Sequence, residues 1–175
     1  YALASSRSVG TRIPFKDGEL IVSDLEAFDF NLARVGLFSP GASVSAIYAP
    51  KAVDAGCVVI DNTSQFRYED DIPLVVSEVN PHAVGNYKNR GIIANPNCST
   101  IQMLVALKPI YDAVGIERIN VCTYQAVSGT GQAAVDELNG QITSIRANNS
   151  LVSSTVYPKQ IACNVLPHID AFQDN

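Results

Sequence analysis

Short apolar runs rich in valine and isoleucine recur along the chain, and a cluster of turn-forming residues follows each of them. The runs are YALA, ELIV, VGLF, CVVI, PLVV, GIIA and INVCTY. Most are continuous rather than alternating, which is typical of strands covered on both faces. Stretches with helical spacing lie between several of them, at 43–56, 101–115 and 132–145, and Pro50 is expected to break or kink the first. This order predicts an α/β fold with a doubly wound, mostly parallel Rossmann-like sheet.

The two ends of the chain indicate a piece of a longer protein. Tyr1 opens inside a predicted strand without an initiator methionine, and the chain stops at the polar residues AFQDN. The composition becomes polar and rich in serine near Gly140, as in a linker, a loop or the start of a second domain. We predict a partial dinucleotide-binding domain at 1–97 that lacks its first βα unit. The beginning of an α+β catalytic, substrate and dimerisation domain is predicted at 98–175.

Charge and hydropathy narrow the choice of partners. Seventeen acidic residues against twelve basic ones give a net charge of −5, and no lysine or arginine cluster is present, which argues against nucleic acid as a partner. No apolar run is long enough to cross a membrane, and the first residues lack a signal-peptide pattern. We therefore predict a cytoplasmic protein with no membrane partner and no metal.

The four cysteines are too few for a disulfide scaffold and indicate a reducing compartment. Cys57 and Cys122 lie in runs predicted as buried strands, whereas Cys98 lies in NPNCST, between the run GIIA and a predicted helix. The thiolate is the nucleophilic form of cysteine, and the first turn of a helix favours negative charge. Cys98 is thus a candidate nucleophile, with Asn97 and nearby N–H groups as oxyanion donors. The alternative is a buried cysteine that fills apolar space.

A cysteine nucleophile usually needs a base, and the sequence offers only His82 and His168. Both lie in loop-like surroundings without a partner motif, so solvated or structural roles are the simpler interpretation. A cysteine hydrolase that uses one of them as its base is the second enzyme hypothesis.

Two turn clusters are candidates for nucleotide binding. The segment SSRS at 5–8 follows the first strand, and hydroxyl groups with an arginine at such a strand end suit a 2′-phosphate. The segment SPGAS at 39–43 is a turn of small residues before a helix, where phosphates can approach backbone N–H groups. Ordinary turn chemistry is the alternative for both. A complete GxGxxG fingerprint is absent, because Gly129 and Gly131 lack the third glycine.

Two further polar residues follow predicted strands. Gln125 ends the run INVCTY and opens the loop AVSGTG, so we expect its amide near the same sheet edge as Cys98. Arg67 follows CVVIDN, and its guanidinium could form a bidentate pair with a phosphate or a carboxylate. For Arg67 the sequence alone favours a salt bridge with Glu69, Asp70 or Asp71.

Taken in order, LASSRS, DNTSQFR, NPNCST and TYQAVSGTG resemble the bacterial aspartate-β-semialdehyde dehydrogenase family over essentially the whole chain. The resemblance implies an NADP-dependent oxidoreductase that interconverts L-aspartyl-β-phosphate and aspartate semialdehyde through a cysteine thioester, on the route to lysine, threonine and methionine. It also implies a homodimer or tetramer. The alternatives are a related acyl-phosphate reductase, of the N-acetyl-glutamyl-phosphate or glyceraldehyde-3-phosphate type, or a catalytically silent truncated domain.

Matching motifs assign roles to individual residues. Cys98 matches the family's nucleophile, Gln125 the glutamine that orients the acyl group, and Asn97 the residue beside the thiol. The residues implied in substrate binding are Arg67, Ser128 and Gly129. Those implied in NADP binding are Ser5, Ser6, Arg7, Ser8, Ser39 and Gly41.

The resemblance also implies parts that the chain does not contain. The glycine fingerprint is expected before Tyr1, and the catalytic histidine, the carboxylate-binding arginine and the rest of the substrate domain are expected after Asn175. Neither His82 nor His168 matches that histidine, which is consistent with the missing base.

Overall fold

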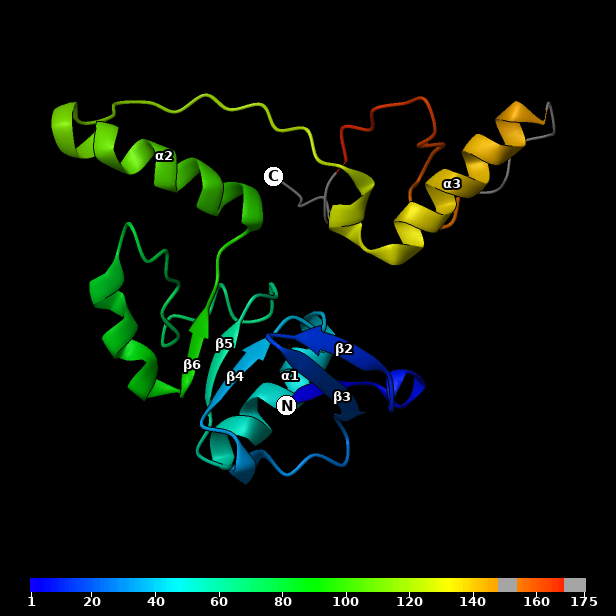
Figure 1. The fold of residues 1–175 in the computed structure, drawn as a ribbon. Coiled ribbons are helices and arrows are strands. Elements are labelled where there is room, and N and C mark those ends of the chain that lie inside the picture. Colours follow the sequence, from blue (N-terminus) through cyan, green and yellow to red (C-terminus); the bar gives the residue numbers. More distant parts are fainter. Residues whose placement is uncertain (148–153, 169–175) are drawn as a thin grey trace. The chain divides into compact units, whose positions relative to one another are not determined.

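The computed structural model describes residues 1–147 and 154–168 and is drawn in Figure 1. The chain divides into two compact units, Tyr1–Ile119 and Asn120–Asn175. The first unit holds all six strands of the described residues, together with helices α1 and α2, and the second holds helix α3.

One three-stranded sheet of the first unit has the order β1-β3-β2. Strand β1 (Ala2–Ala4) runs parallel to β3 (Gly18–Asp24), and β2 (Arg12–Phe15) runs antiparallel to β3. The short 3-10 helix η1 (Ser6–Ser8) follows β1 directly.

The other three-stranded sheet is wholly parallel and has the order β4-β5-β6. Its strands are β4 (Val35–Phe38), β5 (Val58–Asp61) and β6 (Ile92–Ala94). Helix α1 (Ala42–Asp54) joins β4 to β5, and the 3-10 helix η3 (Pro81–Asn89) lies in the connection from β5 to β6. Parallel strands with helical crossovers confirm the predicted Rossmann-like α/β fold.

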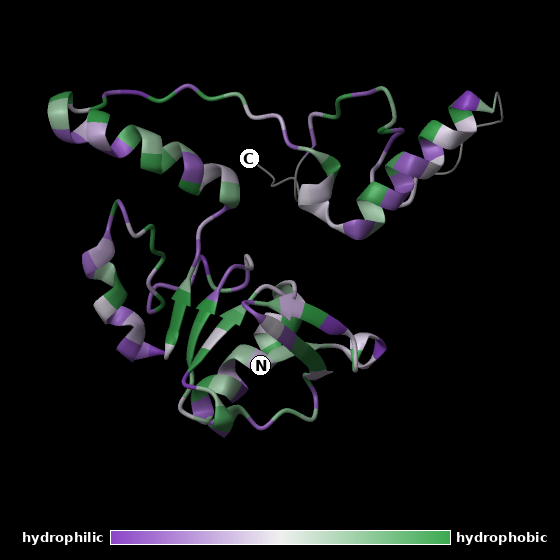
Figure 2. Cartoon of the chain, viewed as in Figure 1, coloured by the Kyte–Doolittle hydropathy of each residue, from purple (hydrophilic) through white to green (hydrophobic). Residues whose placement is uncertain are grey.

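The core of this unit lies where α1 packs on the parallel sheet. The strands of this sheet are largely hydrophobic, as their green colour in Figure 2 shows. Val59 and Ile92 are almost fully buried, and each contributes about 1.5–3 kcal/mol of hydrophobic stabilisation. Small residues on the buried side of α1 allow close approach to the sheet. The buried cluster consists of Phe30, Phe38, Ala49, Ala52, Cys57, Val59, Phe66, Ile72, Ile92 and Ala94.

Five of the seven predicted strands and all three predicted helices are present, but two runs differ. Residues 119–124 form no strand, and Val121 and Tyr124 are 59% and 84% exposed. The run 73–76 makes only an isolated parallel bridge, from Leu74 to Ala94. A strand needs a neighbouring edge that supplies a ladder of hydrogen bonds, and within the described residues 119–124 forms no such ladder. Cys122, predicted to be buried, is therefore exposed.

Local chemistry explains two other differences. Strand β2 was not predicted, although the turn between β2 and β3 contains Lys16 at a φ of 51° followed by Asp17 and Gly18, which suits a hairpin.

Helix α1 continues through Pro50 instead of breaking there. One missing N–H removes one helical hydrogen bond, and packing of the buried Ala49 and Ala52 on either side of Pro50 holds the helix together.

Three elements complete the described chain. Helix α2 (Cys98–Val114) follows β6 and has no fully buried residue. In the second unit, the 3-10 helix η4 (Val127–Thr130) leads into α3 (Gln132–Arg146). Among the described residues, no helix is both long and apolar enough to cross a bilayer.

Candidate active site

The segment predicted to hold a 2′-phosphate lies at the carboxyl end of β1. Ser6 to Ser8 form η1, and all four side chains of 5–8 are exposed. Within the described residues Arg7 forms no ion pair, so its guanidinium remains available for an anion. The hydroxyl groups of the three serines and the guanidinium of Arg7 are all hydrogen-bond donors that suit the oxygen atoms of a phosphate ester.

The second segment predicted to contact the cofactor is the turn between β4 and α1, called the cofactor turn below. Gly41 occupies the N-cap position of α1 with a φ of +98°, a conformation that side chains rarely adopt. Nothing lies within 4 Å of the place where its Cβ would be, so the first turn of α1 is open to a ligand. Ser39 is exposed at the start of the same turn. An open helix N-terminus after a parallel strand is a common phosphate site.

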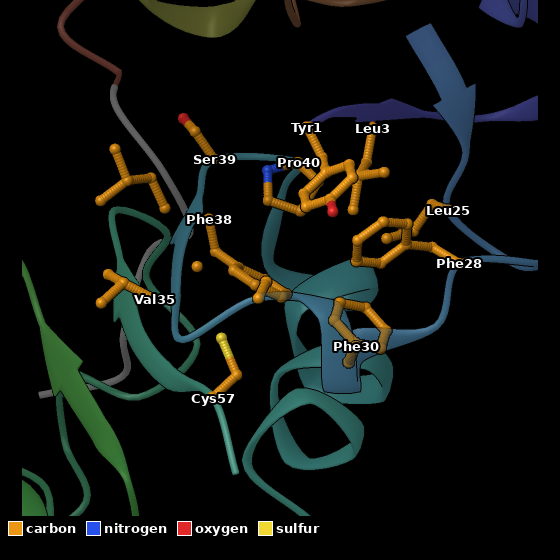
Figure 3. Close-up of a pocket in the computed structure, with 13 residues that line it drawn as sticks. Tyr1, Leu3, Leu25, Phe28, Phe30, Val35, Phe38, Ser39, Pro40 and Cys57 are labelled. Atoms are coloured by element: carbon orange, nitrogen blue, oxygen red, sulfur yellow. The ribbon is translucent and has the colours of Figure 1, made fainter. Parts of the chain in front are cut away.

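An apolar hollow of about 500 Å³ lies between β1 and β4, as the close-up in Figure 3 shows. Leu3 comes from β1, Phe38 from β4, and the rings of Phe28 and Phe30 meet edge to face with their centroids 5.3 Å apart. Ser39 and Pro40 of the cofactor turn stand at its border. Cys57 also lines it, and burial raises the pKa of this thiol, which keeps it protonated and unreactive.

Cys98 is the first residue of α2 and is exposed. Asn97 precedes it as the N-cap, and its side-chain oxygen accepts hydrogen bonds from the N–H groups of Ser99 at 3.0 Å and Thr100 at 3.3 Å. The cap fixes the residue at which the connection from β6 turns into the helix, and so keeps Cys98 at the first helical position. An exposed thiol at this position is not an apolar filler, so that alternative for Cys98 is wrong.

Arg67 lies at the carboxyl ends of β5 and β6. Its Nε donates to the carbonyl of Asn95 at 2.9 Å, and its Nη2 donates to the carbonyl of Asn62 at 3.1 Å. The salt bridge that the sequence favoured is wrong, since Glu69 and Asp71 pair with Arg90 instead. Within the described residues the Arg67 Nη1 makes no hydrogen bond, so the guanidinium is held at two points and keeps one donor group for a ligand.

A chain of asparagines joins this arginine to the cofactor turn. Asn95 Nδ2 donates to Asn62 Oδ1 at 3.4 Å, and Asn62 Nδ2 lies 3.5 Å from the hydroxyl of Ser39. Asp61, the last residue of β5, precedes Asn62 in the chain. Its carboxylate is fully buried and accepts hydrogen bonds from Thr63 and Ser45. The first unit thus brings Ser39, Arg67, Asn97 and Cys98 to the carboxyl edge of one parallel sheet.

The second unit brings together Gln125, Ser128 and Gly129. Gln125 lies over the 3-10 turn, because a Cβ atom at Gly129 would collide with its side-chain amide. Gln125 also lines a shallow hollow of about 800 Å³. The other residues of this hollow are Ala126, Val127, Leu138, Ile161, Cys163, Asn164 and Val165.

His82 is exposed on η3 and makes no hydrogen bond to Cys98 within the part of the chain that the structure describes. Asn62 and Asn95 were missed as site residues, although each is the first polar residue after a parallel strand, which is the signal that could have found them. Glu137 and Gln141 were also missed. They are polar residues one helical turn apart, and both are buried.

Comparison with known proteins gives a consistent result. The model for "Semialdehyde dehydrogenase, NAD binding domain" matches residues 1–87, and "Semialdehyde dehydrogenase, dimerisation domain" matches residues 107–175. The chain is 63% identical over its whole length to an aspartate-semialdehyde dehydrogenase of Legionella pneumophila and 58% identical to one of Shewanella violacea. It covers 50% and 52% of those proteins, so it spans about half the length of the curated relatives that it matches.

Solved structures agree with the sequence comparison. The structure of aspartate semialdehyde dehydrogenase II complexed with ASA from Vibrio cholerae matches with a TM-score of 0.92 and 56% identity. The match covers 98% of this chain and 51% of that one.

Proposed function

This chain belongs to the semialdehyde dehydrogenase family, and from that premise we propose that it carries the cofactor-binding part and the nucleophile of an NADP-dependent aspartate-semialdehyde dehydrogenase. One observation carries the proposal: Cys98 is exposed at the first position of α2, at the same sheet edge as Arg67. The reaction would interconvert L-aspartyl-β-phosphate and L-aspartate-β-semialdehyde.

The thiolate of Cys98 attacks the acyl carbon of the aspartyl phosphate. A C–S bond forms, the bond from that carbon to the phosphate oxygen breaks, and inorganic phosphate leaves. NADPH, when bound, would supply the hydride that reduces the thioester. The C–S bond then breaks, which releases the aldehyde and returns the thiolate. A donor to the developing oxyanion contributes about 3 kcal/mol, and Asn97, beside the thiol, is the residue proposed for that role.

Arg67 is proposed to bind the phosphate group of the substrate. Two of its nitrogen atoms are held by the carbonyls of Asn62 and Asn95, so the guanidinium loses little freedom when a phosphate binds. Its position after β5 places the positive charge at the edge where α2 begins. This arrangement supports phosphate binding next to the nucleophile.

NADP is proposed to bind along the carboxyl ends of β1 and β4. Ser5, Ser6, Arg7 and Ser8 would hold the 2′-phosphate, because hydroxyl and guanidinium groups gather there and the first turn of η1 contains no acidic residue. Ser39 and Gly41 would contact the cofactor at the open N-terminus of α1.

In the second unit, Gln125 is proposed to orient the acyl group, with Ser128 and Gly129 as further substrate contacts. The collision that a Cβ at Gly129 would cause supports this, because glycine there leaves room for the Gln125 amide.

Other parts of the proposal concern the whole protein. A homodimer or tetramer is proposed, and the match to a dimerisation domain at residues 107–175 supports oligomerisation. A cytoplasmic location and a functional boundary between residues 97 and 98 are also proposed.

The test replaces the nucleophile in a full-length protein that contains this chain. We expect Cys98→Ala to abolish phosphate-dependent formation of NADPH from aspartate semialdehyde, because no other group would form the thioester. Cys122→Ala is the matched control, since Cys122 is also an exposed thiol and has no proposed role. Turnover retained by the Cys98→Ala protein would refute the proposal.

A further inference from the structure

The buried carboxylate of Glu137 organises a loop of the second unit. Glu137 lies on α3, and only 8% of its surface is exposed. Its Oε2 accepts the N–H groups of Thr155 and Val156, each at 2.6 Å, and the Thr155 hydroxyl at 3.0 Å. Its Oε1 accepts the N–H of Tyr157 at 3.3 Å. Three successive N–H groups around one carboxylate form an anion nest, which compensates for burying the charge.

The pKa of Glu137 is consistent with this arrangement. The N–H groups of Val156 and Thr155 lower the pKa of this carboxyl below its usual range, since they stabilise the charged form. At neutral pH the group is therefore ionised and accepts all of these hydrogen bonds.

Gln141 holds the following part of the same loop. It lies one turn after Glu137 on α3, and only 1% of its surface is exposed. Its Oε1 accepts the N–H groups of Ile161 at 2.9 Å and Ala162 at 3.0 Å, and its Nε2 lies 3.3 Å from the Ser154 hydroxyl. Residues four apart share one helix face, so the two side chains clamp both parts of the segment 154–162 to α3.

The clamped loop forms part of the surroundings of Gln125. Cys163 and Asn164, directly after the clamp, line the same hollow as Gln125. Cys163 has a φ of 58°, an uncommon conformation for a residue with a side chain. The Tyr157 hydroxyl lies 3.0 Å from the Thr130 hydroxyl of η4. Gly129 of the same turn is the residue against which the Gln125 side chain lies.

We propose that Glu137 and Gln141 are positioning residues for Gln125: they hold the loop that, with η4, fixes the place where the Gln125 amide meets the acyl group. This inference rests on the proposed function for the role of Gln125, but the geometry that it concerns can be measured without turnover. Small displacements of a substrate-orienting group cost large factors in rate.

The experiment compares variants of the 175-residue chain by NMR. In Glu137→Gln, an NH₂ group replaces one carboxylate oxygen and faces N–H groups. We expect the amide protons of Thr155, Val156 and Tyr157 to lose about tenfold or more of their protection from exchange. We also expect the side-chain amide resonance of Gln125 to shift. Asp136→Asn is the matched control, because Asp136 is a neighbouring exposed carboxylate that accepts a hydrogen bond from Gln132 of the same helix and, in the described part of the chain, from no other residue.

Two further variants keep the test decisive. Gly129→Ala displaces Gln125 directly and shows how large the resonance shift can be. Thr130→Val removes only the exposed hydroxyl that contacts Tyr157, and we expect it to shift the Gln125 signal less than Gly129→Ala does. This variant tests the proposal even if Glu137→Gln does not fold. An unchanged Gln125 resonance in Glu137→Gln, or in Thr130→Val if only that variant folds, would overturn the proposal. Loss of loop protection with that resonance unchanged would mean that the clamp is merely structural.

Kinetics of a full-length form add a second readout. We expect Glu137→Gln to lower kcat about tenfold while KM for phosphate stays within about twofold, because Arg67 and not Gln125 is assigned to phosphate. A rise in KM with unchanged kcat would contradict the positioning role. If Cys98 proves dispensable, the proposed function fails, but the NMR result still decides whether the clamp positions Gln125.

Discussion

At the scale of single residues, Arg67 could either form a salt bridge with nearby acidic residues or bind an anion, and its neighbours in the fold decide between the two. Three acidic residues follow it within four positions, which favoured a local ion pair. In the structure Arg90 pairs with two of them, and Arg67 is held by main-chain carbonyls of Asn62 and Asn95. Main-chain carbonyls are neutral, so the guanidinium that they hold keeps its net positive charge for an anion, whereas a salt bridge would have offset that charge.

Replacement of Arg67 tests its assignment to phosphate. We expect Arg67→Lys in a full-length form to lower kcat/KM for phosphate by about ten- to a hundredfold, since charged hydrogen bonds contribute about 1.5–3 kcal/mol and lysine cannot reproduce three contacts at once. The measurement is phosphate-dependent turnover at saturating NADP and semialdehyde. Arg90→Lys is the control, because its exposed ion pairs contribute at most about 1 kcal/mol and lie outside the site. Equal effects of the two substitutions would argue against a phosphate role for Arg67.

At the scale of secondary-structure elements, the junction between β6 and α2 was predictable because its signals are local. An apolar run followed by asparagine, cysteine, serine and threonine contains both the strand and the helix cap, and the structure has the cap at Asn97. Strand β2 and the missing strand at 119–124 were not predictable in this way. Strand formation requires a partner, and the partner is chosen by the fold as a whole.

The cap at Asn97 makes a prediction about α2. We expect Asn97→Ala to destabilise the start of α2 by about 1 kcal/mol, because the N–H groups of Ser99 and Thr100 lose their acceptor. Exchange protection of the first-turn amides, measured by NMR on the 175-residue chain, reports the change. Asn97→Ser should retain most of the protection, since serine is also a good N-cap. An Asn97→Ala protein with unchanged protection would show that the cap does not define the helix start.

At the scale of the whole molecule, each sheet of the first unit ends in strands that have a neighbour on one side only within the described residues. β1 and β4 are edge strands of their sheets, and both border the apolar hollow of Figure 3. Leu37 on β4 is 81% exposed and Val35 is 56% exposed. An exposed apolar edge strand is a template for pairing with another chain.

A substitution at this edge should therefore change self-association of the 175-residue chain. We expect Leu37→Lys to lower concentration-dependent aggregation, measured by light scattering, because a charged side chain on an edge strand opposes edge-to-edge pairing. Tyr68→Lys is the matched control: Tyr68 is 94% exposed but lies outside any strand. Aggregation that falls equally in both variants would indicate a general effect of charge instead of pairing at β4.

Local sequence patterns were enough to predict the α/β class, most strands, all three α-helices and the position of Cys98 at the start of a helix. These features depend on hydrophobic periodicity and on capping residues, which act within a few residues of the chain. Only the tertiary structure decided that Arg67 is held by Asn62 and Asn95, that Glu137 and Gln141 bind a loop about twenty residues away, and that Cys122 is exposed. Those outcomes depend on which distant groups satisfy a buried charge or an open strand edge, and no local pattern encodes that choice.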